Sequence, residues 1–142
     1  MPPPAPIGVV LARTAKTAGR AFDQALAAAG GSQPVWQILI SLKTTQVANQ
    51  RELADAIGIQ SATLTHHLNS METAGLVTRR RDPANRRVHL VELTDHGEQL
   101  FHRLATAAIA HDQRLRKGLT DTEIAQLADL LHRLAANVTD DD

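Results

Sequence analysis

Two short alternating runs of β-forming residues, joined by a tight turn, interrupt a sequence that is otherwise patterned for helices. The runs are residues 76–81 and 88–93, and the second alternates through Val88-His89-Leu90-Val91-Glu92-Leu93. Between them stands Asp82-Pro83-Ala84-Asn85, a combination of residues that favours a turn. The sequence therefore predicts a mainly α-helical fold that carries one small β-hairpin.

Helical spacing of apolar residues accounts for most of the remaining chain. The helices expected from this spacing cover residues 7–29, 32–42, 50–57, 61–74 and 95–117, with a last helix beginning at residue 121. Asn49, Thr94 and the pair Thr120 and Glu123 are the expected caps. The polar stretch 43–48 is predicted to be a connection. The short helices on either side of Gly58 have the spacing of a helix-turn-helix.

The composition of the chain excludes several classes of site and function. The 142 residues fit one domain, and the absence of cysteine excludes disulfides, thiolate metal sites and cysteine nucleophiles. Only 2% of the residues are aromatic, too few for a stacking platform for single-stranded nucleic acid. The apolar runs are too short to span a membrane, and the first residues do not resemble a signal peptide, so a cytoplasmic protein is expected.

A formal net charge of zero hides a separation of charge along the chain. Residues 76–91 contain five arginines and one acid, a local charge of +4, whereas residues 95–142 contain five basic and nine acidic residues, a local charge of −4. The arginines flank a tight turn, so their guanidinium groups are expected to gather in one region. Such a region suits the phosphates and narrow minor grooves of DNA, although a charged run is also compatible with an ordinary solvated surface.

The second short helix carries polar side chains that are suited to reading DNA. Leu64, Leu68 and Met71 are spaced to face inward, which leaves the polar residues on other faces. The candidate DNA-binding residues of this segment are Gln60, Ser61, Thr63, Thr65, His66, Asn69 and Ser70. Amide, hydroxyl and imidazole groups can pair with base edges in the major groove or with phosphates, but each residue could equally be an exposed polar residue of any helix.

Two stretches together resemble the MarR (multiple antibiotic resistance regulator) family of winged helix-turn-helix transcription factors. They are ELADAIGIQSATLTHHLNSMETAGLVTRR and DPANRRVHLVELTDHG, and the flanking helices extend the resemblance to residues 7–137. The wing turn is the most specific part. The sequence departs from the family pattern at Asn85, where the family usually has an acid, and at His66 and Ser70, where it often has arginine.

The resemblance implies a homodimer that binds double-stranded DNA. It implies an N-terminal arm and dimerisation helix (1–31), a winged helix-turn-helix lobe (32–93) and C-terminal dimerisation helices (94–142). Recognition helices would enter successive major grooves of a pseudo-palindromic operator, and the wings would enter minor grooves. The resemblance also implies a repressor that a small lipophilic or aromatic ligand relieves.

Roles for the remaining candidates follow from the same picture. We assign Arg86 to the minor groove at the wing tip, and Arg79, Arg80 and Arg87 to the DNA backbone or to support of the wing. Residues expected near a ligand pocket are Arg13, Arg20, Phe22 and Trp36. The two aromatic residues serve equally well as core.

Three other functions are weighed against DNA binding. The seven histidines suggest a metal sensor, but no two of them lie at i,i+3 or i,i+4 on one helix, so no metal site and no cofactor are expected. An enzyme is not expected, because the chain has no glycine-rich phosphate loop and no G-x-S-x-G motif. A protein-interaction module that binds an acidic partner through its basic hairpin remains an alternative.

Overall fold

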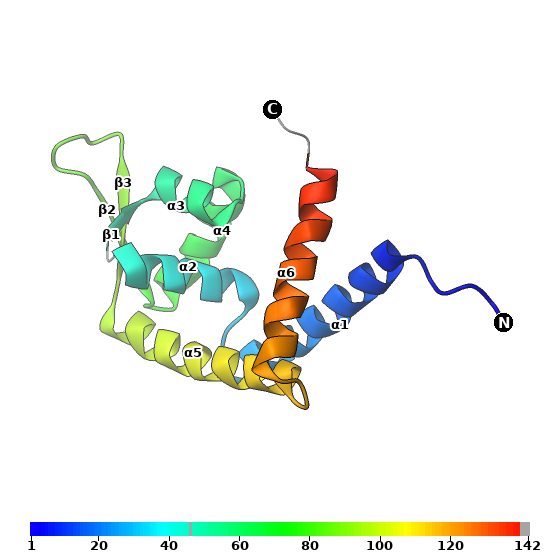
Figure 1. The fold of residues 1–142 in the computed structure, drawn as a ribbon. Coiled ribbons are helices and arrows are strands. Elements are labelled where there is room, and N and C mark those ends of the chain that lie inside the picture. Colours follow the sequence, from blue (N-terminus) through cyan, green and yellow to red (C-terminus); the bar gives the residue numbers. More distant parts are fainter. Residues whose placement is uncertain (46, 140–142) are drawn as a thin grey trace.

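The computed structural model describes residues 1–45 and 47–139, and this part of the chain forms six helices and three strands. The helices are α1 (Ile7–Ala28), α2 (Gln33–Thr45), α3 (Gln50–Ile57), α4 (Ser61–Thr73), α5 (Asp95–Arg116) and α6 (Asp121–Val138). The strands are β1 (Val47–Asn49), β2 (Val77–Arg81) and β3 (His89–Leu93). The prediction of a mainly α-helical fold with a small β-hairpin is confirmed (Figure 1).

Side-chain caps fix where three of the helices begin. The Asn49 side chain accepts a hydrogen bond of 3.0 Å from the Glu52 amide at the start of α3, and Thr94 accepts one of 3.0 Å from the Gly97 amide at the start of α5. At α6, Thr120 and Glu123 form a reciprocal capping box. The Thr120 amide donates to the Glu123 carboxylate, which lowers the pKa of that carboxyl below its ordinary value. The predicted caps are confirmed.

The hairpin belongs to a three-stranded antiparallel sheet with the order β1-β3-β2. The prediction of a connection over residues 43–48 was wrong for 43–45, which belong to α2, and for 47–48, which belong to β1, while residue 46 lies outside the described residues. Ala48 of β1 pairs with Val91 at the centre of β3, and Asn49 pairs with Leu90. These pairings attach the start of α3 to β3 near the turn of the hairpin.

One apolar core joins α2, α3, α4 and the sheet to parts of α1 and α5. Its buried members come from all of these elements and include Leu26, Ile38, Leu42, Leu53, Leu64, Leu68, Met71, Val91 and Leu104. The predicted inward positions on α4, Leu64, Leu68 and Met71, are therefore confirmed. Burial of this stripe fixes the rotation of α4 about its axis and turns its polar positions outward.

A close junction joins the end of α4 to the start of α5. The Thr94 hydroxyl lies within hydrogen-bonding distance of two carbonyl oxygens, 2.6 Å from that of Gly75 and 2.9 Å from that of Leu76. Gly97 packs against the Leu76 carbonyl so tightly that a Cβ at this position would overlap the carbonyl oxygen. The Thr-x-x-Gly pattern of residues 94–97 thus sets the direction in which α5 leaves the sheet.

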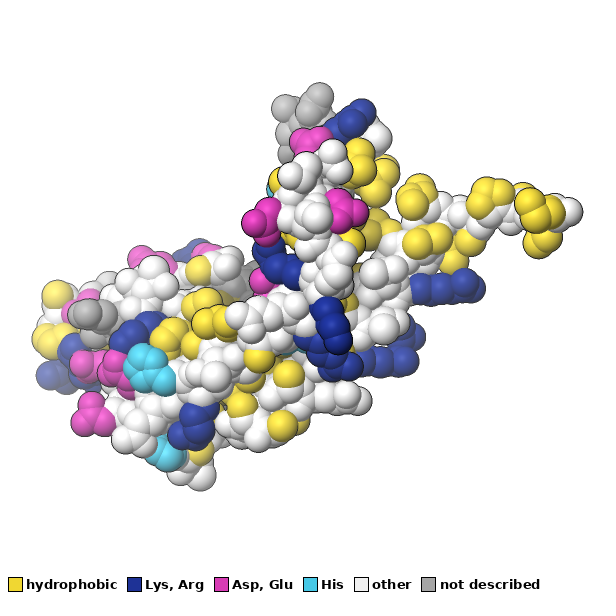
Figure 2. Space-filling model, turned by 60° about the horizontal axis from the view of Figure 1, so that its bottom comes forward, with side chains coloured by type: hydrophobic (Ala, Val, Ile, Leu, Met, Phe, Trp, Pro, Cys, Tyr) yellow, Lys and Arg dark blue, Asp and Glu magenta, His cyan; other side chains and the backbone are white. Residues whose placement is uncertain are grey.

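The first half of α1 and the whole of α6 project away from the lobe formed by α2, α3, α4 and the sheet (Figure 1). None of the residues of α6 is buried, and Leu127, Leu130 and Leu131 are 48%, 51% and 39% exposed. Figure 2 shows hydrophobic side chains on the side of α6 that faces the N-terminal arm. Two adjoining cavities of about 300 and 340 Å³ lie between α1 and α6 and share Ile7 and Leu134.

Candidate nucleic-acid interface

Helix α4 presents a polar face on the side opposite its buried stripe. Of the residues predicted to bind DNA from this segment, those that are exposed are Gln60, Ser61, Thr63, His66, Asn69 and Ser70. They come from the N-cap and from successive turns of one helix, so the structure brings them together on one surface. His66 also lies next to the half-buried His67, with 5.7 Å between the ring centroids.

Thr65 lies at the boundary between this face and α3. Its hydroxyl donates a hydrogen bond of 2.9 Å to the Ser61 carbonyl and accepts one of 2.8 Å from the Gln50 side chain. The hydroxyl therefore connects the first turns of α3 and α4. Its part in base reading stays a prediction.

An arginine of β2 fastens the strand to α4. One Arg79 guanidinium nitrogen donates to the Asn69 side-chain oxygen at 2.6 Å and to a Glu72 oxygen at 3.1 Å. The Arg79 backbone amide also donates to Glu72, at 3.2 Å. The side-chain hydrogen bond from Arg79 is the main reason that the pKa of Glu72 lies below its ordinary value. We call Arg79, Glu72 and Asn69 the clasp.

The clasp joins two of the predicted DNA-binding residues, Asn69 and Arg79, to each other and joins Arg79 to Glu72, contacts that the sequence did not reveal. Arg79 is only 20% exposed and connects β2 to α4, while its role as wing support or as a DNA contact stays a prediction. The Asn69 oxygen is engaged by a cation, which leaves its NH₂ group as the donor directed away from the clasp. Glu72 was absent from the sequence-based candidates, because an exposed glutamate near a helix end carries no distinguishing pattern.

The turn of the wing is held by its own backbone and side chains. The Asp82 side chain accepts from the Ala84 amide at 2.9 Å, and the Asn85 side chain accepts from the Arg87 amide at 3.2 Å. An Arg81 guanidinium nitrogen donates to the Arg86 carbonyl at 3.4 Å. Asn85 thus acts as a neutral acceptor where the family usually has an acid.

The arginines of the wing differ in how firmly they are held. Arg80 lies 4.0 Å from Glu92 across the sheet, and both side chains are about half exposed. Arg86 and Arg87 are exposed, and no ion pair among residues 1–45 and 47–139 involves either of them. The wing therefore presents two unneutralised guanidinium groups near its tip, beside the polar face of α4.

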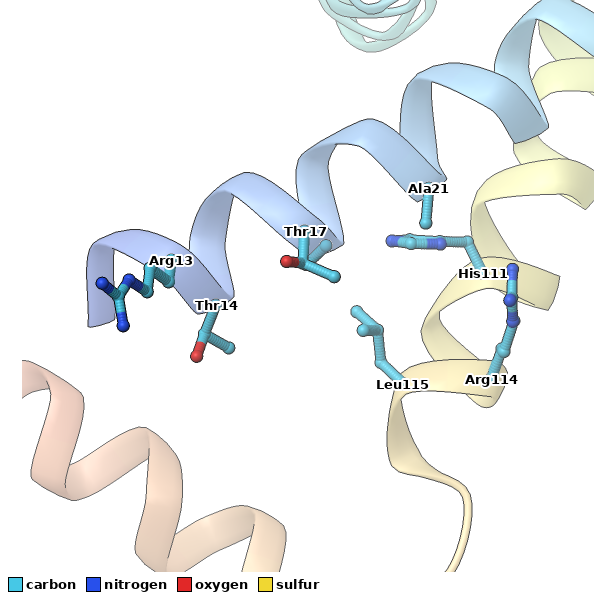
Figure 3. A pocket seen from close by; sticks show the side chains of 8 residues that line it. Arg13, Thr14, Thr17, Ala21, His111, Arg114 and Leu115 are labelled. Carbon is cyan, nitrogen blue, oxygen red and sulfur yellow. The ribbon is translucent and has the colours of Figure 1, made fainter. Parts of the chain in front are cut away.

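A cavity of about 470 Å³ lies between α1 and the end of α5 (Figure 3). Arg13, predicted near a ligand pocket, lines it together with Thr17, His111 and Arg114. Phe22 stacks on His111, with 4.9 Å between the ring centroids, and so supports the wall of this cavity.

The other two candidates for a ligand pocket lie elsewhere. Trp36 stacks on Phe101 at 5.6 Å between α2 and α5, and Arg20 does not line the cavity. Of the four predicted pocket residues, only Arg13 lines the cavity, and Phe22 is connected to it through His111. Periodicity alone did not identify His111 and Arg114, because their approach to α1 depends on how α5 packs.

The described residues also bear on metal binding and on membrane insertion. Among them no three histidine, aspartate or glutamate side chains are grouped as a metal ion would require. Within the same residues no helix is long and apolar enough to cross a membrane.

The arrangement of α3, turn, α4 and β-hairpin defines the winged helix-turn-helix class of DNA-binding protein. The family model that matches residues 32–89 is described as "MarR family". A relative from Bacillus subtilis (strain 168), described as the uncharacterized HTH-type transcriptional regulator YdgJ, is 30% identical over 112 residues, 79% of this chain and 68% of the relative. The chain belongs to the MarR family of transcriptional regulators, which are not enzymes.

Solved structures share this fold. The transcriptional repressor CouR, bound to a 23-mer DNA duplex, is 27% identical with a TM-score of 0.82, and the match covers 92% of each chain. BpsR of Bordetella bronchiseptica, whose DNA binding is regulated by 6-hydroxynicotinic acid, is 23% identical with a TM-score of 0.77. That match covers 91% of this chain and 98% of BpsR.

Proposed function

We propose that this protein is a cytoplasmic homodimeric repressor that binds a pseudo-palindromic operator in double-stranded DNA and is released by a small ligand. The observation that carries the proposal is the pairing of one exposed polar helix face with an arginine-tipped wing, fixed to each other by the clasp. A rigid pair of this kind can follow adjacent grooves of one duplex.

The polar face of α4 is suited to the major groove. Gln60 and Thr63 stand in its first turn, where a recognition helix usually approaches base edges, and Ser61 can bind a phosphate there. His66 and Ser70 lie on later turns of the same exposed face. Arg86 at the wing tip is suited to a narrow minor groove, whose negative potential attracts arginine.

A second copy of this chain is the partner that α1 and α6 fit best. The leucines of α6 are exposed in the single chain, although the capping box shows that the sequence specifies this helix strongly. Apolar helix faces of this size normally mark an interface. Residues 1–31 and 94–142 would then supply most of the dimer contact, and residues 32–93 would bind DNA.

The cavity between α1 and α5 is our candidate for an effector site. It combines the cationic groups of Arg13 and Arg114 with the ring of His111, which stacks on Phe22. Cationic and aromatic groups together suit an aromatic anion. The regulation of BpsR by 6-hydroxynicotinic acid supports a ligand of this kind.

The proposal is tested by selecting bound sequences from a random pool of double-stranded DNA at a stated salt concentration. We expect a pseudo-palindrome with half-sites about 10 bp apart. Aromatic carboxylates are then screened for release of the selected DNA, with Arg13→Gln as the variant that should respond less. Failure to enrich any sequence would exclude an operator-binding repressor and favour the protein-interaction alternative.

A further inference from the structure

Strand β1 brings the first turn of α3 next to the start of β3, where the chain returns from the wing turn. Asn49, the N-cap of α3, pairs with Leu90 of β3, so α3 begins beside the strand that leaves the wing. The hydrogen bond of 2.8 Å from Gln50 to Thr65 adds the first turn of α4 to the same place. Three elements from separate parts of the sequence therefore meet here.

A groove of about 480 Å³ opens where these elements meet. Its lining residues are Asn49, Gln50, Arg51, Ser61, Arg87, Val88 and His89. Arg51 and Arg87 approach from opposite walls, one on α3 and one on the wing, and both are exposed. We call this the α3–wing groove.

The chemistry of the α3–wing groove is that of an anion site. Two guanidinium groups, the Ser61 hydroxyl and the His89 ring can all donate hydrogen bonds, and the described residues that line the groove include no carboxylate. Arginine forms paired hydrogen bonds with phosphate oxygens. The site is therefore suited to a phosphate with two or three free oxygens.

The position of the groove identifies which phosphate it can receive. It separates the start of α4 from the wing, the two elements that the proposed function places in adjacent DNA grooves. A strand of the duplex that passes from one DNA groove to the next must cross the space between these elements. We infer that the α3–wing groove holds a backbone phosphate of the bound DNA and that Arg51 is a DNA contact, an inference that rests on the proposed function.

The test compares Arg51→Gln with Arg103→Gln, which removes the same charge from an exposed position on α5. Fluorescence anisotropy measures the affinity for operator and unrelated DNA between about 50 and 200 mM salt. We expect Arg51→Gln to weaken binding to both DNAs equally. Between these salt concentrations its total loss of affinity should be smaller than that of the wild type by a factor of about 3.5 for each phosphate contact removed. Arg103→Gln should match the wild type.

Two further measurements distinguish the possible outcomes of this test. Arg51→Lys should recover most of the salt dependence, since an ammonium also neutralises a phosphate, and circular dichroism checks that each variant is folded. Inorganic phosphate is titrated at constant ionic strength while NMR follows the His89 ring. If the wild type binds DNA and Arg51→Gln binds it with the same affinity and salt dependence, the inference is overturned while the proposed function stands. A change in the His89 signals on adding phosphate would in that case show that the groove binds a free anion. Loss of DNA binding by the wild type itself would overturn the proposed function as well.

Discussion

Gly97 is the glycine at which the fold has the least room for an added side chain. It lies in the first turn of α5, where a Cβ would overlap the Leu76 carbonyl oxygen and also meet Leu93. Backbone atoms cannot move aside as a flexible side chain can. We predict that Gly97→Ala destabilises the protein by about 1–3 kcal/mol or more, despite the better helix propensity of alanine. Urea unfolding followed by circular dichroism measures this difference.

Gly19 provides the matched control for that substitution. It also lies within a long helix, α1, but no atom lies within 4 Å of where its Cβ would be. Gly19→Ala should therefore be neutral or stabilise the chain by up to about 1 kcal/mol. Equal effects at the two positions would show that the contact between α5 and Leu76 is not close.

The clasp predicts a particular dependence of stability on pH. Because Arg79 lowers the pKa of Glu72, the ionised carboxylate stabilises the fold above its ordinary pKa, and this contribution is lost as the pH falls through the lower, folded value. We predict that Glu72→Gln lowers the melting temperature near neutral pH and that the difference from wild type shrinks below about pH 4. A constant difference across the acid range would mean that the charge on Glu72 is not what stabilises the clasp.

Sequence reasoning at this scale selects residues by their chemical type and cannot show which neighbours they contact after folding. The basic wing residues Arg86 and Arg87 were predicted from local charge, and the structure leaves both exposed. Glu72 and Arg51, the residue of our further inference, were not among the predicted residues, because the groups beside them are brought close only by folding. Thr65 was assigned to DNA from its type alone, whereas the structure gives its hydroxyl two partners within the protein.

The wing is the element whose contribution to DNA binding can be measured separately. Arg86 lies at its tip and is exposed, while the turn beneath it is held by Asp82 and Asn85. We predict that Arg86→Ala weakens operator binding and lowers the slope of log affinity against log salt by about 0.9 for each phosphate charge no longer neutralised. Salt-dependent anisotropy checks this, with Arg103→Ala as the control. Unchanged affinity at physiological salt would contradict the assignment of Arg86.

Helices were predicted from the sequence more completely than strands, for a physical reason. A helix satisfies its backbone within a few residues, so caps such as Asn49 and Thr120 locate it from local sequence. Strand β1 has three residues, and it exists because Ala48 can pair with Val91, more than forty positions away. No local pattern of that length distinguishes a strand from a connection, so residues 47 and 48 were predicted as a connection.

Across the whole molecule, the polar and apolar surfaces occupy different ends. The lobe of α2, α3, α4 and the sheet buries its apolar side chains together with parts of α1 and α5, whereas α6 buries none of its residues and α1 leaves Ile7, Val10 and Leu11 exposed. In a dimer these faces would cover one another, and the two lobes would be held at a fixed spacing. DNA affinity would then depend on α6, although α6 is far along the chain from the polar face of α4.

This dependence gives a prediction for the assembly. Leu131 is 39% exposed on the α6 seam, so Leu131→Glu should leave the lobe folded but place a charge in the proposed interface. We expect a monomer by sedimentation and a loss of operator affinity of about a hundredfold or more, since a single lobe binds one half-site without the gain from linkage. Gln126→Glu adds the same charge on another face of α6 and should remain dimeric. If Leu131→Glu stays dimeric and binds the operator fully, the second copy must be held through surfaces other than α6.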